Sequence, residues 1–538
     1  MMENLPDGWR WARLGEIAEI KGGGTPRRKN PEFFSGDIPW ATPTDLSSLD
    51  SLYISNTKEC ITEESIKRSS TTLLPENTVL MSSRATIGLV AIAKTPICTN
   101  QGFANFICKK IVVPEYLAYL LMINKDKFIN LAGGSMFKEI TKTALRKIPI
   151  PLPPLPEQKI IAEILQRADE IRQKRKQALG MVDEFLRSTF LEMFGDPATN
   201  PKEWDVVRLG EVCEIIMGQS PPSSTYNTQK LGLPFLQGKA EFTDLYAIPI
   251  KWCSSPKKVA EKDNILMSVR APVGPVNLSP EKLCIGRGLC AIRGKIRKMN
   301  QRFLFHYLRF ISKDLEKMGS GSTFKAITKK QVENIKIPLP PLSHQQAFAR
   351  IAERAEETRK RLKQALNESE DLFNSLLDQA FTGELTAKWR EEFYAKLRLS
   401  EPQGALFSIL KGIPSHELPV TAMMKYGFLV QEEAGVGLGY AFEPYHYGPF
   451  TEEVYKDLNE LESLGMVVQE EAGSERRIRL NYTGEVEVSE DVKEGAERIL
   501  SEYGGLSLDE LLERVYEKYP EYAERSKRGR GDQIAINK

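Results

Sequence analysis

The amino-acid sequence is poor in the residues that build disulfide frameworks, metal centres and membrane spans. Its 538 residues include seven cysteines and four histidines, and no two cysteines form a CxxC pair. This pattern fits reduced thiols better than a disulfide scaffold or a zinc site. There is no run of about 18 apolar residues, and the first residues lack the apolar segment of a secretory signal. We therefore expect a cytoplasmic protein.

Enzyme motifs are also missing. The sequence has neither the GxxxxGK[ST] phosphate loop nor the HExxH zinc motif. Glu157 and Lys159 match the short E-x-K half of a nuclease signature, but a repeated segment further along has His344 and Gln346 there, so the first turn of a helix is the better interpretation. The glycines from Gly435 to Gly439 superficially resemble a nucleotide-binding loop, yet the required helix does not follow, and a flexible hairpin is predicted instead. No catalytic and no metal-binding residue is predicted.

Charge is distributed unevenly along the chain. The formal net charge is only +2, but the residues from Leu397 onward carry a net charge of about −11, which leaves about +13 on the first 396 residues. A basic segment suits binding to a phosphate backbone, whereas an acidic one is repelled by it. The two parts are therefore predicted to have different partners.

A long unit occurs twice, as comparison of the sequence with itself shows. GWRWARLGEIAEI returns 195 residues later as EWDVVRLGEVCEI, and VLMSSRATIGLV returns after 186 residues as ILMSVRAPVGPV. GGSMFKEITKTALRKIPIPLPPL returns after 187 residues as SGSTFKAITKKQVENIKIPLPPL. Between these blocks the copies differ, most visibly at residues 27–37 against 223–232. One scaffold therefore carries two different surfaces.

Each copy continues into a segment that reads as one long helix, opened by Pro156 in the first and by Pro341 in the second. Apolar residues in these segments alternate at spacings of four and three, which is the heptad pattern of a coiled coil. Arg172 and Arg359 occupy the same seam position in the two copies. Two copies suffice for an internal pseudo-dimer with a two-fold axis, which makes the helices antiparallel.

The predicted fold class is α+β and multidomain: two α/β heads in a pseudo-two-fold repeat, two long antiparallel coiled-coil helices, and a small, mainly helical C-terminal domain. The predicted boundaries are 1–155 for the first head, 156–197 for the first helix, 198–342 for the second head, 343–390 for the second helix, and 397–538 for the acidic domain.

This layout favours bipartite DNA recognition. DNA presents the same groove about every 34–36 Å, so two reading heads must be held at a fixed separation, and a rigid helical pair would hold them so. Two unlike heads on a symmetric frame would read an asymmetric site with unread base pairs between its halves.

The chain resembles the specificity subunits of type I restriction-modification systems over about residues 1–390. The resemblance is carried by WARLGEIAEIKGG, IPIPLPPLPEQKIIAEIL, FGDPATNPKEW, IKIPLPPLSHQQ and LDQAFTGELT. It implies a non-catalytic, DNA-binding subunit with two target-recognition domains, whose helices dock modification (methyltransferase) subunits, two of them expected, joined by restriction (motor-nuclease) subunits. S-adenosylmethionine, ATP and Mg would belong to those partners, so no cofactor is expected in this chain.

Candidate DNA-binding residues come from glycine-rich or divergent loops that carry Thr, Arg, Lys or Gln, which contact phosphates and base edges. Residues retained by both copies, such as Arg84 and Arg270, are as readily explained by a shared scaffold as by a shared phosphate contact. The aromatic residues Trp9, Trp40, Trp204 and Phe235 are predicted to anchor the core. The candidates are Thr25, Arg27, Arg28, Lys29, Thr44, Arg84, Gln101 and Lys138 in the first head, and Gln219, Gln237, Lys239, Arg270, Arg287 and Lys325 in the second.

The acidic part is predicted to contain helices over 405–410, 420–431, 452–464 and 508–519 and a hairpin over 466–480. Tyr447, Gly448, Pro449 and Phe450 carry a weak resemblance to small phage-associated, antitoxin-like domains. The order of elements also suits a winged helix, although the negative charge argues against a primary DNA role. A protein partner of unknown identity is the preferred hypothesis for this domain. For the chain as a whole, the alternatives are a self-contained nuclease or methyltransferase and a protein-binding assembly scaffold that reads no DNA.

Overall fold

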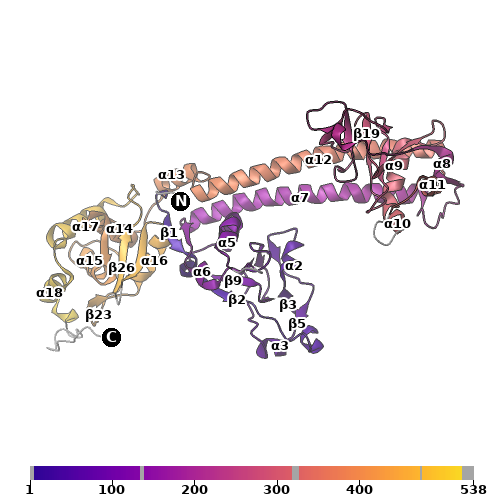
Figure 1. Ribbon diagram of the computed structural model, residues 1–538. Coiled ribbons are helices and arrows are strands. Elements are labelled where there is room, and N and C mark those ends of the chain that lie inside the picture. The colour runs from indigo at the N-terminus through magenta and orange to yellow at the C-terminus, as the bar shows by residue number, and fades with distance from the viewer. Residues whose placement is uncertain (1–4, 134–137, 318–325, 473–474, 524–538) are drawn as a thin grey trace. The chain divides into compact units, whose positions relative to one another are not determined.

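The computed structural model describes residues 5–133, 138–317, 326–472 and 475–523. The chain divides into two compact units, residues 1–173 with 369–538 and residues 174–368 (Figure 1). The first unit holds the first head, one end of each long helix and the C-terminal domain, and the second unit holds the second head with the rest of both helices. The predicted class, two α/β heads joined by two long helices, is confirmed.

The first head is built on two sheets, in the orders β2–β9–β6–β7–β4 and β5–β3–β8. A two-stranded sheet of β1 (Arg10–Arg13) and β10 (Pro149–Leu152) joins the beginning of the head to its end. The other strands are β2 (Ala18–Gly22), β3 (Ile38–Ala41), β4 (Tyr53–Ile54), β5 (Cys60–Ile61), β6 (Val79–Ser82), β7 (Val90–Ala93), β8 (Cys98–Thr99) and β9 (Phe103–Cys108). The helical segments are α1 (Leu14–Ile17), η1 (Pro31–Phe34), α2 (Pro43–Ser47), α3 (Glu63–Lys67), α4 (Pro114–Ile123), α5 (Lys125–Leu131) and α6 (Lys142–Arg146).

The second head repeats this architecture, with sheets in the orders β12–β20–β17–β18 and β13–β15–β14–β19–β16 and a β11–β21 pair. The heads share one parallel strand pair, β3 with β8 and β14 with β19, and the first head has a second, β4 with β7. The strands are β11 (Val206–Arg208), β12 (Cys213–Met217), β13 (Tyr226–Asn227), β14 (Leu233–Leu236), β15 (Lys251–Cys253), β16 (Val259–Ala260), β17 (Ile265–Ser268), β18 (Val276–Leu278), β19 (Leu283–Ile285), β20 (Leu289–Gly294) and β21 (Lys336–Pro338). The helical segments are α8 (Leu209–Val212), η2 (Ser223–Thr225), α9 (Gln301–Phe310), α10 (Ser312–Lys317) and α11 (Lys329–Glu333).

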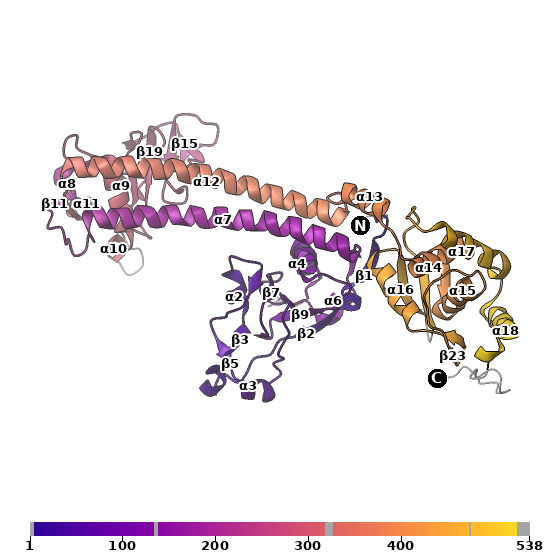
Figure 2. The same ribbon diagram turned by 180° about the vertical axis from the view of Figure 1, so that it is seen from behind.

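The two long helices are α7 (Leu155–Phe194) and α12 (Leu342–Thr382), and they run antiparallel within each unit (Figure 2). In the first unit the guanidinium of Arg172 lies 4.7 Å from the centre of the Phe373 ring. In the second unit Arg359 pairs with Asp183. Helix α12 is shorter than the predicted segment because Gly383, at φ +77°, ends it. A separate helix, α13 (Ala387–Lys396), follows.

A buried carboxylate joins the start of α7 to the segment that follows α12. Glu157 accepts hydrogen bonds from Trp9 Nε1 at 2.9 Å, Thr386 Oγ1 at 2.5 Å and Arg390 Nη2 at 2.6 Å, and its side chain is fully buried. Its position in the first turn of α7 agrees with the helical interpretation of the E-x-K segment. We call Trp9, Glu157, Thr386 and Arg390 the clasp.

The equivalent place in the second copy has no such ion pair. His344 stands where the first copy has Glu157, and its ring lies 5.9 Å from that of Trp204. Trp204 donates to the carbonyl of Phe194 at 3.2 Å and is half-buried, whereas Trp9, Trp40 and Phe235 are buried as predicted. At this junction the peptide chain itself runs from α7 into the second head, so no clasp is needed to join them.

The C-terminal domain has its own hydrophobic core. Its elements are α14 (Glu401–Gly412), β22 (Glu417–Pro419), α15 (Val420–Glu432), β23 (Glu443–Tyr445), β24 (Gly448–Phe450), α16 (Glu453–Ser463), β25 (Val467–Ala472), β26 (Glu475–Leu480), α17 (Glu490–Tyr503), α18 (Leu508–Lys518) and η3 (Pro520–Tyr522). The predicted helices and the 466–480 hairpin are present, but α17 and the β23–β24 hairpin were not foreseen. The hairpin predicted at Gly435–Gly439 is wrong, since Val436, Leu438 and Tyr440 are buried in an irregular segment that packs on the core.

None of the helices in the described part of the chain has the length and apolar content that crossing a bilayer requires.

Candidate nucleic-acid interface

Loops at one edge of the first head converge on a common junction. They follow β2, β3, β6 and β8, and backbone hydrogen bonds tie them together: Gly24 N to Thr99 O at 2.9 Å, Asn100 N to Ala41 O at 3.0 Å, and Ser83 N to Gly102 O at 2.8 Å. The loops approach one another so closely that a Cβ on Gly23 would lie 1.9 Å from the carbonyl oxygen of Asn100. The glycine-rich segment is therefore explained by backbone packing, and the side chains beside it are left on the surface.

Several predicted residues of the first head meet at this junction. The hydroxyl of Thr25 donates to Oε1 of Gln101, and both belong to loops of the junction. Arg84 is exposed and pairs with Glu139 at 3.8 Å. Lys138 lies beside Arg84, because its carbonyl accepts a hydrogen bond from Ala85 N at 3.2 Å. The junction thus presents amide, hydroxyl and basic groups on one edge of the head.

Thr44 is also exposed, in the first turn of α2, which begins directly after β3. This turn is fixed by Asp45, whose carboxylate accepts hydrogen bonds from Thr42 and from the backbone of Lys58. Burial opposes ionisation of Asp45, but these hydrogen bonds outweigh it and lower its pKa. Asp45 was not among the sequence candidates, and it acts on the loop rather than on a ligand.

Arg28 is held differently from its neighbours. Its guanidinium forms a double hydrogen bond with Glu59 and lies 4.5 Å from the Phe34 ring centre and 5.0 Å from that of Trp40. The hydrogen bond raises the pKa of Arg28 and lowers that of Glu59. Arg27 and Lys29, on either side, are exposed. Arg28 thus orders the divergent loop, while its two neighbours face solvent.

The second head builds the same junction with other residues. The loops follow β12, β14, β17 and β19, and they are joined by Gln219 N to Ile285 O at 3.1 Å, Gly286 N to Leu236 O at 2.8 Å, and Val269 N to Gly288 O at 2.9 Å. Arg287 N donates to the hydroxyl of Ser220 at 3.3 Å. Ser220 and Arg287 stand at the positions of Thr25 and Gln101 in the first head, at the repeat spacings of 195 and 186. The two junctions therefore share their pattern of backbone hydrogen bonds but carry different side chains.

Gln237 is placed by glycines that flank Arg287. A Cβ on Gly288 would lie 2.5 Å from the carbonyl oxygen of Gln237, and one on Gly286 would lie 3.0 Å from its Cα. Gln219, Gln237, Arg270 and Arg287 are all exposed at the junction. Lys239 is exposed further along the loop after β14, and Lys325 lies outside the described residues.

Sequence reasoning missed the residues that support these loops. Asn105 is fully buried in β9 and donates to the hydroxyl of Thr99 at 2.8 Å, directly beneath the Gln101 loop. Ser220 and Glu59 were likewise not proposed. A buried polar residue in an apolar strand is the signal that could have identified Asn105, whereas Glu59 is recognisable only once the fold brings it to Arg28.

The described part of the chain has no group of three His, Cys, Asp or Glu side chains that could hold a metal ion. Burial raises the pKa of the Cys98, Cys213 and Cys290 thiols to about 12, so these groups stay protonated at neutral pH. The side chains at the two junctions are suited to hydrogen bonding and phosphate contact.

Comparison with known proteins gives one family. The model of the type I restriction modification DNA specificity domain matches residues 6–180 and again residues 201–369. The two matches cover the two heads and most of the long helices, and they leave the C-terminal domain unmatched.

Individual relatives agree with the family match. The Methanocaldococcus jannaschii protein provisionally named type I restriction enzyme MjaX specificity subunit is 36% identical over 409 residues, which cover 71% of this chain and 95% of that protein. The MjaIX specificity subunit of the same organism is 30% identical over 374 residues, covering 64% and 86%. The crystal structure of the HsdS subunit from Thermoanaerobacter tengcongensis is 34% identical and covers 71% of this chain and 99% of that one, with a TM-score of 0.33.

Proposed function

Since the chain belongs to the type I restriction modification DNA specificity family, we propose that its two heads each read one half of an asymmetric, bipartite DNA site. The chain is the sequence-specificity subunit of such a complex. Its own residues supply binding and orientation, and methylation and cleavage reside in partner subunits.

The observation that carries this proposal is a junction built twice with different side chains. Thr25 and Gln101 in the first head correspond to Ser220 and Arg287 in the second. A glutamine side chain suits the paired acceptor and donor of adenine, whereas arginine suits the two acceptors of guanine. Recognition of two different half-sites requires two heads that share a backbone arrangement and differ in the side chains at the junction.

The long helices are the docking surfaces for the modification subunits. In the first unit Ile171 is 50% exposed and Leu372 is 59% exposed, and in the second unit Met181 is 64% exposed and Phe185 is 50% exposed. Large apolar side chains exposed on otherwise charged helices mark surfaces that a protein partner covers. S-adenosylmethionine, ATP and Mg are assigned to those partners and to the restriction subunits, and the complex would act on DNA in the cytoplasm. The acidic C-terminal domain is assigned a protein partner rather than DNA.

The test is to co-express the chain with its modification subunit and to map methylated adenines across a host genome by single-molecule sequencing. We expect one asymmetric motif with a fixed gap. Gln101→Ala should relax one half of this motif and Arg287→Ala the other. Glu490→Ala, at an exposed position in the C-terminal domain, serves as the control and should leave the motif unchanged.

A complex that assembles and binds the methyl donor but yields no motif would overturn DNA reading by this chain. The assembly-scaffold alternative would then replace it.

A further inference from the structure

The C-terminal domain has the element order of a winged helix. Its order is α14, β22, α15, α16, β25 and β26, with the β23–β24 hairpin inserted between the second and third helices. The sheet order is β22–β26–β25, so the short first strand pairs with the last one and the β25–β26 hairpin forms the wing. In this topology the third helix, here α16, is the one that enters the major groove of DNA.

The side-chain charges of α16 do not suit binding in the major groove of DNA. Its eleven residues, EVYKDLNELES, carry Glu453, Asp457, Glu460 and Glu462 against the single cation Lys456. Phosphates would repel such a helix, since binding to the DNA backbone depends on cations that replace its counterions. The recognition-helix face is therefore not a DNA-binding face.

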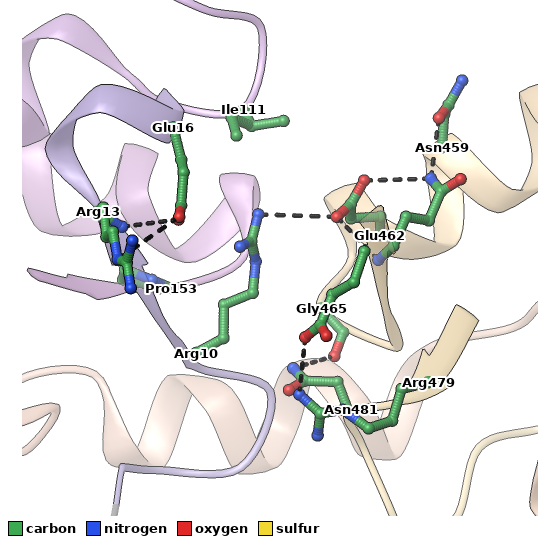
Figure 3. A network of polar contacts seen from close by, with 12 residues as sticks. Arg10, Arg13, Glu16, Ile111, Pro153, Asn459, Glu462, Gly465, Arg479 and Asn481 are labelled. Carbon is green, nitrogen blue, oxygen red and sulfur yellow. Dashed lines mark hydrogen bonds and ion pairs between the residues drawn. The ribbon is translucent and has the colours of Figure 1, made fainter. Parts of the chain in front are cut away.

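Glu462, near the C-terminal end of α16, makes a polar contact with the base of the first head (Figure 3). Nη2 of Arg10, on β1, lies 3.6 Å from Oε1 of Glu462, and the two side chains are only 20% and 16% exposed. Glu462 is held in place by Gln469 of β25, whose side-chain amide donates to it at 3.1 Å and whose backbone N–H donates at 3.3 Å. A partly buried, oriented pair of this kind contributes more than an exposed one.

Backbone packing accompanies the ion pair. Gly465, in the turn after α16 at φ +76°, approaches the head so closely that a Cβ there would lie 2.4 Å from Pro154 and 2.7 Å from the carbonyl oxygen of Gly8. On the Pro154 side of the Arg10–Glu462 pair a cavity of about 20 Å³ remains, which is room for about one water molecule. On the side of Trp11 and Gln469 the two surfaces stand apart around a cavity of about 1230 Å³. The two surfaces are thus closely fitted at Gly465 and Pro154 and open beside them.

Tyr394, at the end of α13, connects this contact to the clasp. Its hydroxyl donates to the carbonyl of Leu464 at 3.0 Å, and its ring stacks on Tyr482 at a centroid distance of 4.0 Å. It is 3% exposed and lies one turn after Arg390 of the clasp. Helix α13 therefore contributes both Arg390 to the clasp and Tyr394 to the contact with the C-terminal domain.

We propose that residues 397–523 form a winged-helix domain whose recognition helix, α16, binds protein instead of DNA through its C-terminal end and the turn that follows, and that its partner is the base of the first head of the same chain. By binding β1, Pro154 and α13 together, the domain reinforces the first head at the end of α12, where the clasp and the apolar packing of Phe373, Leu377 and Ala380 hold it without a peptide link. Its role is to position the first head, which has no peptide link at this place, whereas the second head has one.

The test is charge exchange across the Arg10–Glu462 pair in the full-length chain, followed by hydrogen exchange. We expect Glu462→Arg and Arg10→Glu each to speed exchange in β1 and in residues 394–400 at least tenfold. The double variant R10E/E462R should restore slow exchange. Glu513→Arg, the same charge reversal at an exposed position of α18, is the matched control and should change neither segment. Unchanged exchange in E462R, or no recovery in the double variant, would overturn the proposal.

Two further measurements separate docking from misfolding and from DNA binding. Amides of α15 lie in the core of the domain and should stay protected in E462R, which shows that the domain has undocked without unfolding.

In the assembled complex, E462R should weaken discrimination at the half-site of the first head more than at the other, and the charge exchange should recover it. This last readout rests on the proposed function, whereas the exchange measurements do not, so the two can fail separately. Gain of DNA affinity on undocking would show that the α16 face binds DNA and would overturn the proposal.

Discussion

The joining of the start of α7 to the segment after α12 depends most on the carboxylate of Glu157. Glu157→Ala leaves Arg390 without its partner in a site where that side chain is 12% exposed, and breaking a buried ion pair in this way costs about 3–5 kcal/mol. We expect a loss of this size in the free energy of unfolding of the first head, measured by chemical denaturation. The control is His344→Ala at the equivalent exposed position, which should cost no more than about 0.5 kcal/mol. If Glu157→Ala lowers the free energy of unfolding by no more than His344→Ala does, the clasp contributes nothing to stability.

Lys425 provides a second test at the residue scale. It is 2% exposed in the C-terminal core, where its ammonium donates to the carbonyl of Pro449 at 2.7 Å, and burial lowers its pKa to about 7. The unfolded chain binds this proton more tightly, so stability rises as the pH increases from about 7 towards 10.5, by about 1.4 kcal/mol per unit of the pKa difference.

Lys425→Met should therefore stabilise the domain at pH 7 and remove this rise. Because the substitution also removes the hydrogen bond to the carbonyl of Pro449, the expected gain in the free energy of unfolding at pH 7 is only about 2 kcal/mol. Denaturation of both proteins at pH 6.5, 8 and 9.5 measures the effect, and a difference between them that is independent of pH would contradict the assigned cause.

At the scale of elements, the loops of the second junction depend on close backbone packing. Gly288→Ala places a Cβ against the carbonyl of Gln237, whereas Gly238→Ala, in the neighbouring loop, meets nothing within 4 Å. We expect G288A to destabilise the second head by about 1–3 kcal/mol and G238A to be nearly neutral. Thermal unfolding of the two variants measures this difference, and a reversed order would contradict the described packing.

The long helices should bind partners through their exposed apolar side chains. Phe185→Asp and Met181→Asp are expected to weaken binding of the modification subunit at least tenfold, because they put a charge into a surface that the partner covers. Thr483→Asp adds the same charge at an exposed polar position of the C-terminal domain, away from α7, and should have little effect. Calorimetry or co-purification checks this, and equal weakening by all three variants would indicate a general effect of charge.

At the scale of the whole molecule, the two heads should contribute independently to DNA affinity. Gln101 and Arg287 belong to different compact units. Each change to alanine should cost about 1–3 kcal/mol of discrimination at its own half-site, and the double variant should show the sum to within about 0.5 kcal/mol. Competition binding at fixed salt concentration measures these terms, and strong non-additivity would mean that the heads act as one site.

Much of the architecture was determined by the sequence itself. The repeated blocks predicted two heads of one fold, and the heptad spacing predicted the two long helices, because duplication and periodicity are properties of the chain alone. Elements defined by tertiary contacts were not predictable. The run Gly435–Gly439 was taken for a hairpin since glycines favour turns, but Val436 and Leu438 are drawn into the core by burial. The extent of α12 was overestimated: Gly383 is a residue type that commonly ends helices, and its φ of +77° shows that α12 ends there.

The same division holds for the site. Sequence divergence between the copies identified the loops, and the structure brings most of the proposed side chains to one junction in each head. Only the tertiary structure decided that Arg28 is held by Glu59 and two aromatic rings while Arg27 faces solvent. It alone brought Arg10 to Glu462, which lie 452 positions apart. A linear sequence records which groups exist, but burial and distance, which decide what each group binds, arise only when remote segments meet.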